Sequence, residues 1–138
     1  GYDMTVNNKR VLALLANAYM QGFTAGVNMA GNEASFNTGM PMNALSLMGM
    51  HILSAGVYEG EDYVEKNEAK YKRLFYSEDK LKGFILVDDI ECAGIYTAMI
   101  RNKTPLSSVD FDLIKRKPSL CALAIEKRSN LLNGKETW

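Results

Sequence analysis

Residues 80–106, KLKGFILVDDIECAGIYTAMIRNKTPL, place a strand, a polar break and a helix in succession. The apolar run in 80–87 predicts the strand. Apolar residues then recur at helical spacing from about Ile90, and the residue before Pro105 disfavours helix, so the helix ends there. Between them, Asp88 and Asp89 suit a turn and a helix N-cap better than a metal or acid site. This stretch predicts a mixed α+β domain.

Strand signals continue upstream of this stretch. Residues 45–56, LSLMGMHILSAG, predict one extended strand with Gly49 as a bulge. Polar breaks of hairpin length separate the predicted strands, which are 45–56, 62–66, 69–78 and 80–89. We therefore predict a meander of three or four antiparallel strands with one charged face.

A long helix is predicted farther upstream, from Leu15 to Ala30, with Gly31 as its C-terminal stop. Within it, small residues fall at a strict spacing of four, at Ala18, Gly22, Gly26 and Ala30. Each glycine inside a helix costs about 1 kcal/mol relative to alanine. A helix that keeps such a bare stripe is shaped to pack closely against another element.

Composition narrows the function class. The 138 residues are 47% apolar and 23% charged, which is typical of a globular chain. The 16 basic and 16 acidic residues balance, which gives no support to a nucleic-acid partner, and no apolar run is long enough to span a membrane. Cys92 and Cys121 have no zinc-ligand spacing and are expected to be buried free thiols. His51, the single histidine, is expected to be a core or edge residue and not a base.

The composition also changes along the chain. We expect a terminal segment and helix in 1–31, a linker in 32–44, an α+β domain in 45–118 and a tail in 119–138. Ser108 is the expected N-cap of a short helix that ends before Pro118. The first residue is Gly1 and not methionine, so we expect the chain to be a piece of a longer protein.

Methionines gather around the predicted linker. Five of the eight lie between positions 29 and 50, including Met40 and Met42. Methionine is an adaptable filler of cores, but it also suits a surface that accepts a flat aromatic ligand or a partner. The clustering slightly favours the second interpretation.

Four motifs in order resemble one enzyme family. They are YDM with RVLAL (2–14), NAYMQGFTAGVNMAG (17–31), MGMHILSAG (48–56) and the stretch 80–106. Residues 2–118 thereby resemble NAD(P)/FAD-dependent pyridine nucleotide-disulfide oxidoreductases. The similarity is to the branch that contains rubredoxin reductases, NADH oxidase-like proteins and the large subunit of assimilatory nitrite reductase.

The resemblance implies the last helix of an FAD-binding domain followed by the C-terminal interface domain. It implies that the backbone amides of Leu15 and Ala16 face the pyrimidine edge of the flavin and that Met40 and Met42 lie near its ring. The missing FAD domain would press on the bare stripe. No His-x-x-x-x-Glu element occurs, so a dithiol relay is disfavoured.

The implied parent enzyme is cytoplasmic and moves electrons from NAD(P)H through FAD to an acceptor. Its implied partners are its own FAD and NAD domains, a second subunit in a homodimer and an electron-carrier protein. This part alone is expected to bind no cofactor and to catalyse nothing. The alternative is a stand-alone, non-catalytic α+β protein-interaction module, which would have no reason to keep an exposed glycine stripe.

Overall fold

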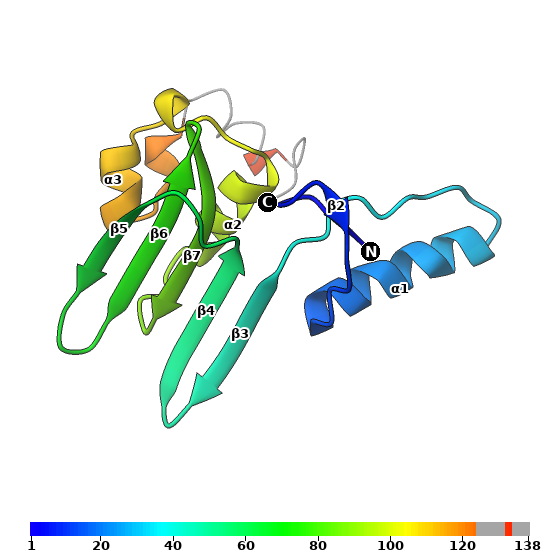
Figure 1. The fold of residues 1–138 in the computed structure, drawn as a ribbon, viewed down its shortest axis with the longest axis horizontal. Helices are drawn as coiled ribbons and strands as arrows, with labels where there is room; N and C mark the ends of the chain where they lie inside the picture. Colours follow the sequence, from blue (N-terminus) through cyan, green and yellow to red (C-terminus); the bar gives the residue numbers. More distant parts are fainter. Residues whose placement is uncertain (124–131, 134–138) are drawn as a thin grey trace.

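A five-stranded antiparallel sheet is the centre of the computed structural model, which describes residues 1–123 and 132–133 (Figure 1). The order across the sheet is β3-β4-β7-β6-β5. The strands are β3 (Met42–Leu47), β4 (Met50–Gly56), β5 (Glu61–Lys66), β6 (Tyr71–Ser77) and β7 (Lys80–Val87). The predicted antiparallel α+β sheet is confirmed, but it has five strands and is not a simple meander, because β4 pairs with β7 and not with β5.

The additional strand comes from the apolar run 45–56, which is a hairpin. Leu47 pairs with Met50, and the two residues between them, Met48 and Gly49, have φ angles of 52° and 82°. Two consecutive positive φ angles match the twist of a two-residue hairpin turn. The prediction of one strand with a bulge at Gly49 was therefore wrong.

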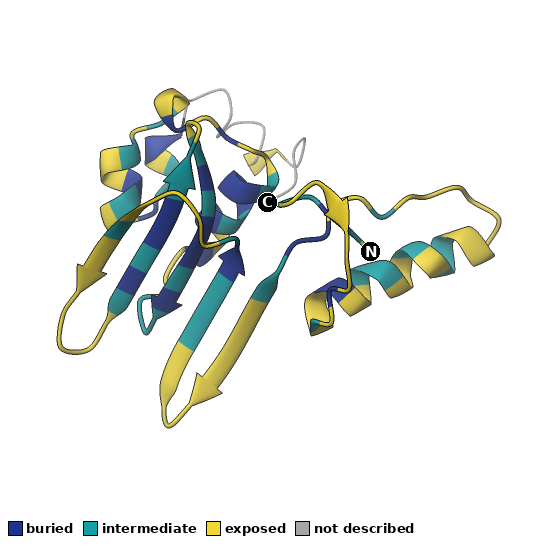
Figure 2. Cartoon of the chain, in the orientation of Figure 1, coloured by how far each residue is buried: buried dark blue, intermediate teal, exposed yellow. Residues whose placement is uncertain are grey.

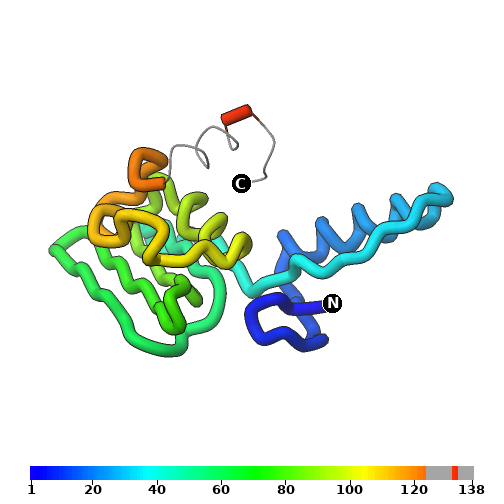
Figure 3. The backbone as a smooth tube through the Cα atoms, turned by 90° about the horizontal axis from the view of Figure 1, so that it is seen from above, coloured from blue at the N-terminus to red at the C-terminus, as the bar shows by residue number. Residues whose placement is uncertain are grey.

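Helical segments cover one face of the sheet (Figure 3). They are α2 (Ala93–Arg101), η1 (Leu106–Ser108), α3 (Phe111–Arg116) and η2 (Leu120–Ala122). Helix α2 begins three residues later than predicted, because Cys92 has a left-handed φ of 58°. Asp110, and not Ser108, caps α3: its carboxylate accepts a 3.0 Å hydrogen bond from the Leu113 amide.

The core lies between the sheet and these helices (Figure 2). Leu74, Phe84 and Leu86 are almost fully buried on the covered face of the sheet. Tyr96 and Ile114 close over them from α2 and α3. Burying aliphatic and aromatic side chains in this way is the main stabilising term of the fold.

The N-terminal segment lies beside the sheet. Strands β1 (Tyr2–Asp3) and β2 (Asn8–Lys9) form a small hairpin that precedes helix α1 (Leu15–Met29). The chain turns at Gly31, whose φ is 86°, and residues 32–40 run back along the helix (Figure 3). The predicted helix and its glycine stop are confirmed.

Three smaller expectations concern the cysteines, the histidine and the C-terminal tail. Cys92 and Cys121 are free but exposed, so the predicted burial was wrong. His51 is exposed near the β3–β4 turn. Most of the predicted tail, 119–138, lies outside the described residues. None of the described helices has the length and apolar character needed to cross a bilayer.

Candidate functional site

An open groove of about 220 Å³ lies where the N-terminus of α1 meets the sheet and α2. Its walls are small or apolar, and they include Ala16, Met42, Leu53, Phe84, Gly94 and Thr97. The residues come from α1, three strand segments and α2, so the fold brings distant parts of the chain together. Two of the predicted site residues, Ala16 and Met42, share this groove.

The first turn of α1 offers free hydrogen-bond donors next to the groove. Leu14, the N-cap residue, is extended and makes no side-chain cap, and the first turn has no acidic residue. Within the described part of the chain, the N–H groups of Leu15, Ala16 and Asn17 meet no acceptor. Such orphan donors carry the positive end of the helix dipole and favour a negative group.

Asn17 fixes this end of the helix. It is fully buried, and its side-chain amide donates a 2.8 Å hydrogen bond to the Met40 carbonyl. The Met40 amide donates back to the Asn17 side-chain oxygen at 3.3 Å. Buried polar groups need such partners. Sequence reasoning missed Asn17, although a polar, poor helix former inside an apolar helix was a usable signal.

Met40 itself lies behind the groove. Its side chain is fully buried and packs in the core cluster, and its peptide group makes the hydrogen bonds with Asn17 of α1. Met42 is half-buried and forms part of the groove wall. Leu15 is 88% exposed at the helix end. Gly94 and Thr97, which sequence reasoning did not single out, complete the opposite wall.

Helix α1 turns its apolar side outward. Tyr19 and Phe23 follow Leu15 at a spacing of four and are 76% and 67% exposed, while Asn17 on the opposite side is buried. An added Cβ at Gly22 or Gly26 would meet nothing within 4 Å. A surface helix normally buries its apolar stripe and exposes its polar face. The bare stripe therefore belongs to an uncovered apolar surface.

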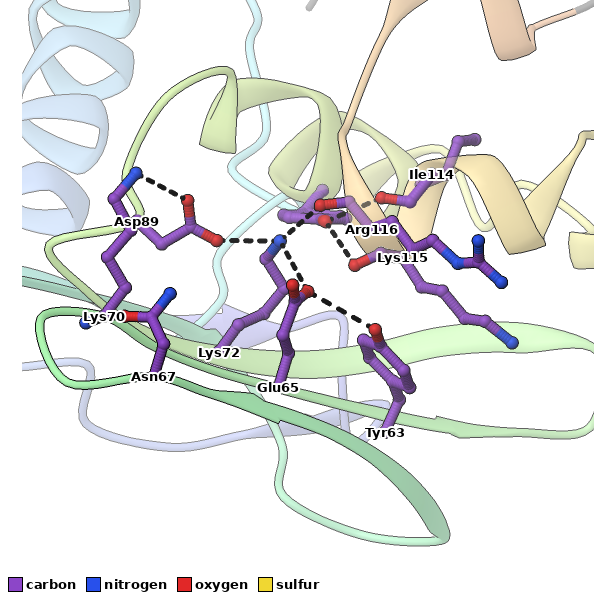
Figure 4. A network of polar contacts seen from close by, with 10 residues as sticks. Tyr63, Glu65, Asn67, Lys70, Lys72, Asp89, Ile114, Lys115 and Arg116 are labelled. Carbon is purple, nitrogen blue, oxygen red and sulfur yellow. Dashed lines mark hydrogen bonds and ion pairs between the residues drawn. The ribbon is translucent and has the colours of Figure 1, made fainter.

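A second polar cluster is structural (Figure 4). The Lys72 side chain is 3% exposed, and its ammonium lies 2.7 Å from the Asp89 carboxylate and 3.5 Å from that of Glu65. It also donates a 2.7 Å hydrogen bond to the Arg116 carbonyl. Three oxygen atoms thus lie around the buried ammonium. The cluster holds the end of α3 against the sheet.

The same cluster corrects the interpretation of the two aspartates. Asp89 pairs with Lys72, and the Asp88 carboxylate accepts a 2.7 Å hydrogen bond from the His51 amide. The N-cap of α2 is Cys92, which makes no side-chain cap. The predicted N-cap role of the aspartates was therefore wrong. Among the described residues, no group of three or more acidic, histidine or cysteine side chains could hold a metal ion.

The sheet and α2 match a known protein family. Residues 41–104 match the family model of the rubredoxin NAD+ reductase C-terminal domain. These 64 of the 138 residues are similar to a rubredoxin reductase C-terminal domain. The match supports a C-terminal domain of a pyridine nucleotide-disulfide oxidoreductase, as the four motifs indicated. No curated protein matches the chain. Helix α1 precedes the matched residues, and the finer domain boundaries stay a prediction.

Proposed function

We propose that this reductase domain works in a flavoprotein that moves electrons from NAD(P)H through FAD to an acceptor. In that enzyme, the chain closes one side of the flavin site and forms an interface with another subunit or a carrier. Two observations support the proposal: the reductase-family match, and the outward apolar face of α1. The exposed helix face carries more weight for the site, because exposed apolar side chains that line up along one helix face indicate a partner surface.

The residues at the groove fit a flavin. Its walls are small and apolar, which suits a flat ring, and orphan N–H groups lie at its edge. We propose that the amides of Leu15 and Ala16 face the N1–C2=O edge of the ring. When bound, FAD supplies the electron-transfer chemistry. The positive end of α1 would stabilise negative charge at that edge.

The methionines have different proposed tasks. Met42, on the groove wall, would contact the ring. Met40 is buried, so its contribution would be to hold the helix end in place through its hydrogen bonds with Asn17. Neither residue transfers a proton or an electron in this proposal.

The proposed partners follow from the uncovered helix. The FAD-binding domain would cover Leu15, Tyr19 and Phe23, and a separate NAD domain would bind the nicotinamide nucleotide. An electron carrier such as rubredoxin, which the family description names, is the proposed acceptor, and a homodimer is the proposed assembly. By itself, the chain is proposed to bind no cofactor.

An absorption spectrum tests the proposal. The protein is expressed from its complete natural reading frame, purified and scanned between about 300 and 550 nm, where bound flavin absorbs. We expect flavin bands that bleach on addition of NADH or NADPH. A colourless protein of about the size of this chain would overturn the proposal and favour the stand-alone interaction module.

A further inference from the structure

A basic pocket lies between the β1–β2 hairpin, strand β7 and the end of helix α2, and its volume is about 240 Å³. Its lining residues include three lysines, Lys80, Lys82 and Lys103. The basic pocket and the groove at the start of α1 share no lining residue. The proposed flavin role therefore leaves the basic pocket unexplained.

The three lysines reach the pocket from two elements. Strand β7 has a bulge at Lys82, which has no pairing partner in β6 between Leu81 and Gly83. A bulge turns its extra side chain out of the regular alternation of the strand. Lys80 begins the same strand. Lys103 follows the C-terminus of α2, where a cation is favourable, but the helix end does not account for the two lysines of β7.

The positive charge in the pocket exceeds the negative charge. Glu78 is the one acidic residue among the lining residues, and its carboxylate lies 2.9 Å from the Lys82 ammonium. The neighbouring Asp79 carboxylate is also engaged, because it accepts hydrogen bonds of 2.9 and 2.6 Å from one residue of η1. Among the described residues, the ammonium groups of Lys80 and Lys103 have no ion pair. Two positive charges are therefore left for a ligand.

The rest of the wall strengthens the attraction for an anion. Leu81 and Ile100 line the pocket and are 2% and 5% exposed. Buried apolar walls lower the local dielectric constant, so charges interact more strongly there than on an open surface. The side-chain oxygen of Asn7 accepts a hydrogen bond from the Tyr2 hydroxyl, and its NH₂ group has no acceptor in the described part of the chain. The hairpin thus adds a neutral donor.

We propose that the basic pocket binds a small oxyanion of the phosphate type, either inorganic phosphate or the phosphoryl group of a small metabolite. A phosphate monoester carries a charge of about −1.5 to −2, which matches the two unpaired lysines, and lysine binds phosphate as a point charge. The volume lies below the roughly 300 Å³ at which typical ligand pockets begin. A whole dinucleotide is therefore too large for it.

Binding in this pocket would connect two parts of the chain. The oxyanion would be held by Lys80 and Lys103 on the side of the sheet and α2, and by Asn7 on the side of the hairpin. The hairpin precedes α1, so an occupied pocket should protect the hairpin amides from hydrogen exchange. This inference goes beyond the proposed function and does not rest on it.

An NMR titration of the nitrogen-labelled 138-residue chain with inorganic phosphate, from about 0.1 to 20 mM at constant ionic strength, tests the site. We expect saturable shifts of the amides around Asn7, Lys82 and Lys103. Lys103→Gln should raise Kd about fivefold or more. Lys66→Gln is the control, because it removes the same charge at the opposite end of the sheet, and it should leave Kd unchanged.

Glu78→Gln provides a test in the opposite direction. It removes the one carboxylate among the lining residues and releases Lys82 from its ion pair, so Kd should fall. A misfolded variant could not give this gain in affinity. An unchanged or higher Kd in a folded Glu78→Gln chain would contradict the inference.

Two further ligands define the chemistry. Methyl phosphate that binds at least as tightly as inorganic phosphate would assign the pocket to a phosphoryl group of a metabolite, and weaker binding would assign it to free phosphate. Acetate, with one negative charge, should bind at least tenfold more weakly than phosphate. Equal binding of acetate, equal losses in Lys66→Gln and Lys103→Gln, or shifts away from the pocket would overturn the inference. The flavin spectrum is independent of these results, so failure of this inference and failure of the proposed function are distinguishable.

Discussion

The Asn17 side chain holds the Met40 peptide group by two hydrogen bonds, with the side-chain amide donating at 2.8 Å and the side-chain oxygen accepting at 3.3 Å. The Met40 side chain lies in the core of the sheet domain. One residue therefore links helix α1 to that core. This link sets where the free N–H groups of α1 lie relative to the groove.

Asn17→Ala should loosen α1. It leaves the Met40 amide and carbonyl without partners in a buried place, and we expect a loss of about 1–3 kcal/mol in the free energy of unfolding. Urea denaturation and hydrogen exchange of the α1 amides measure it. Asn28→Ala is the control, because Asn28 forms a similar clamp with Ala34 at 2.9 and 2.7 Å, but at an exposed site. Equal losses in both variants would contradict the prediction.

Gly22→Ala should stabilise the chain. An added Cβ meets nothing within 4 Å, and alanine is the better helix former by about 1 kcal/mol. Gly31→Ala is the matched control: it also has open space, but its φ of 86° strains alanine, so it should destabilise. Thermal unfolding of both variants measures the contrast. A melting temperature that falls in Gly22→Ala would show that the stripe is already covered.

Gly22→Leu should have opposite effects in two settings. The chain alone should fold normally, because the stripe faces open space. In the protein from its complete reading frame, the added side chain should obstruct the proposed FAD domain and lower the flavin-to-protein absorbance ratio. Unchanged flavin content in the Gly22→Leu protein would refute the proposed contact.

Gly83→Ala should destabilise the sheet. An added Cβ would lie 2.3 Å from the Val57 carbonyl oxygen, a backbone atom that cannot move away easily. Such overpacking costs about 1–3 kcal/mol. Gly94→Ala, in α2, has open space and should not destabilise. Urea midpoints of the two variants provide the comparison, and equal midpoints would show that the sheet relaxes around the methyl group.

Acid should weaken the cluster around Lys72. Partial burial raises the pKa of Asp89, but hydrogen bonds and charge from Lys72 and Lys70 outweigh it, so the pKa falls below its ordinary 3.8. A carboxylate with a depressed folded pKa stabilises the fold above its unfolded pKa and loses that contribution as pH falls through the folded one. We expect stability to drop below about pH 4. Asp89→Asn should flatten this part of the pH profile, and an unchanged profile would exclude Asp89 as its source.

The sequence predicted which segments form helices and strands better than it predicted where each segment begins and ends. Helix α1 and its stop at Gly31 follow from local signals, and the structure confirms them. The β3–β4 turn was not predicted. Its first residue, Met48, is apolar, but it occupies a left-handed position where sequence patterns lead one to expect Asn or Gly. The ion pair of Asp89 was not predicted for another reason. Its partner, Lys72, is distant in the sequence and becomes a neighbour only when the sheet forms.

The groove was predictable in part. Ala16 and Met42 came from a family resemblance, and the structure places both on one groove. Asn17 required knowledge of the residue opposite it, which only the return of residues 32–40 along the helix supplies. The exposure of Leu45 and Leu47 on β3 was not predicted, because an apolar run alone does not reveal which side of a sheet the helices cover.

The link through Met40 has a consequence for synthesis on the ribosome. Translation produces α1 before any of the strands β3 to β7. Until those strands have paired, Met40 has no core to enter, and Asn17 has no fixed peptide group to hold. The link between Asn17 and Met40 can therefore form only after the sheet, so α1 becomes anchored to this domain late in its synthesis.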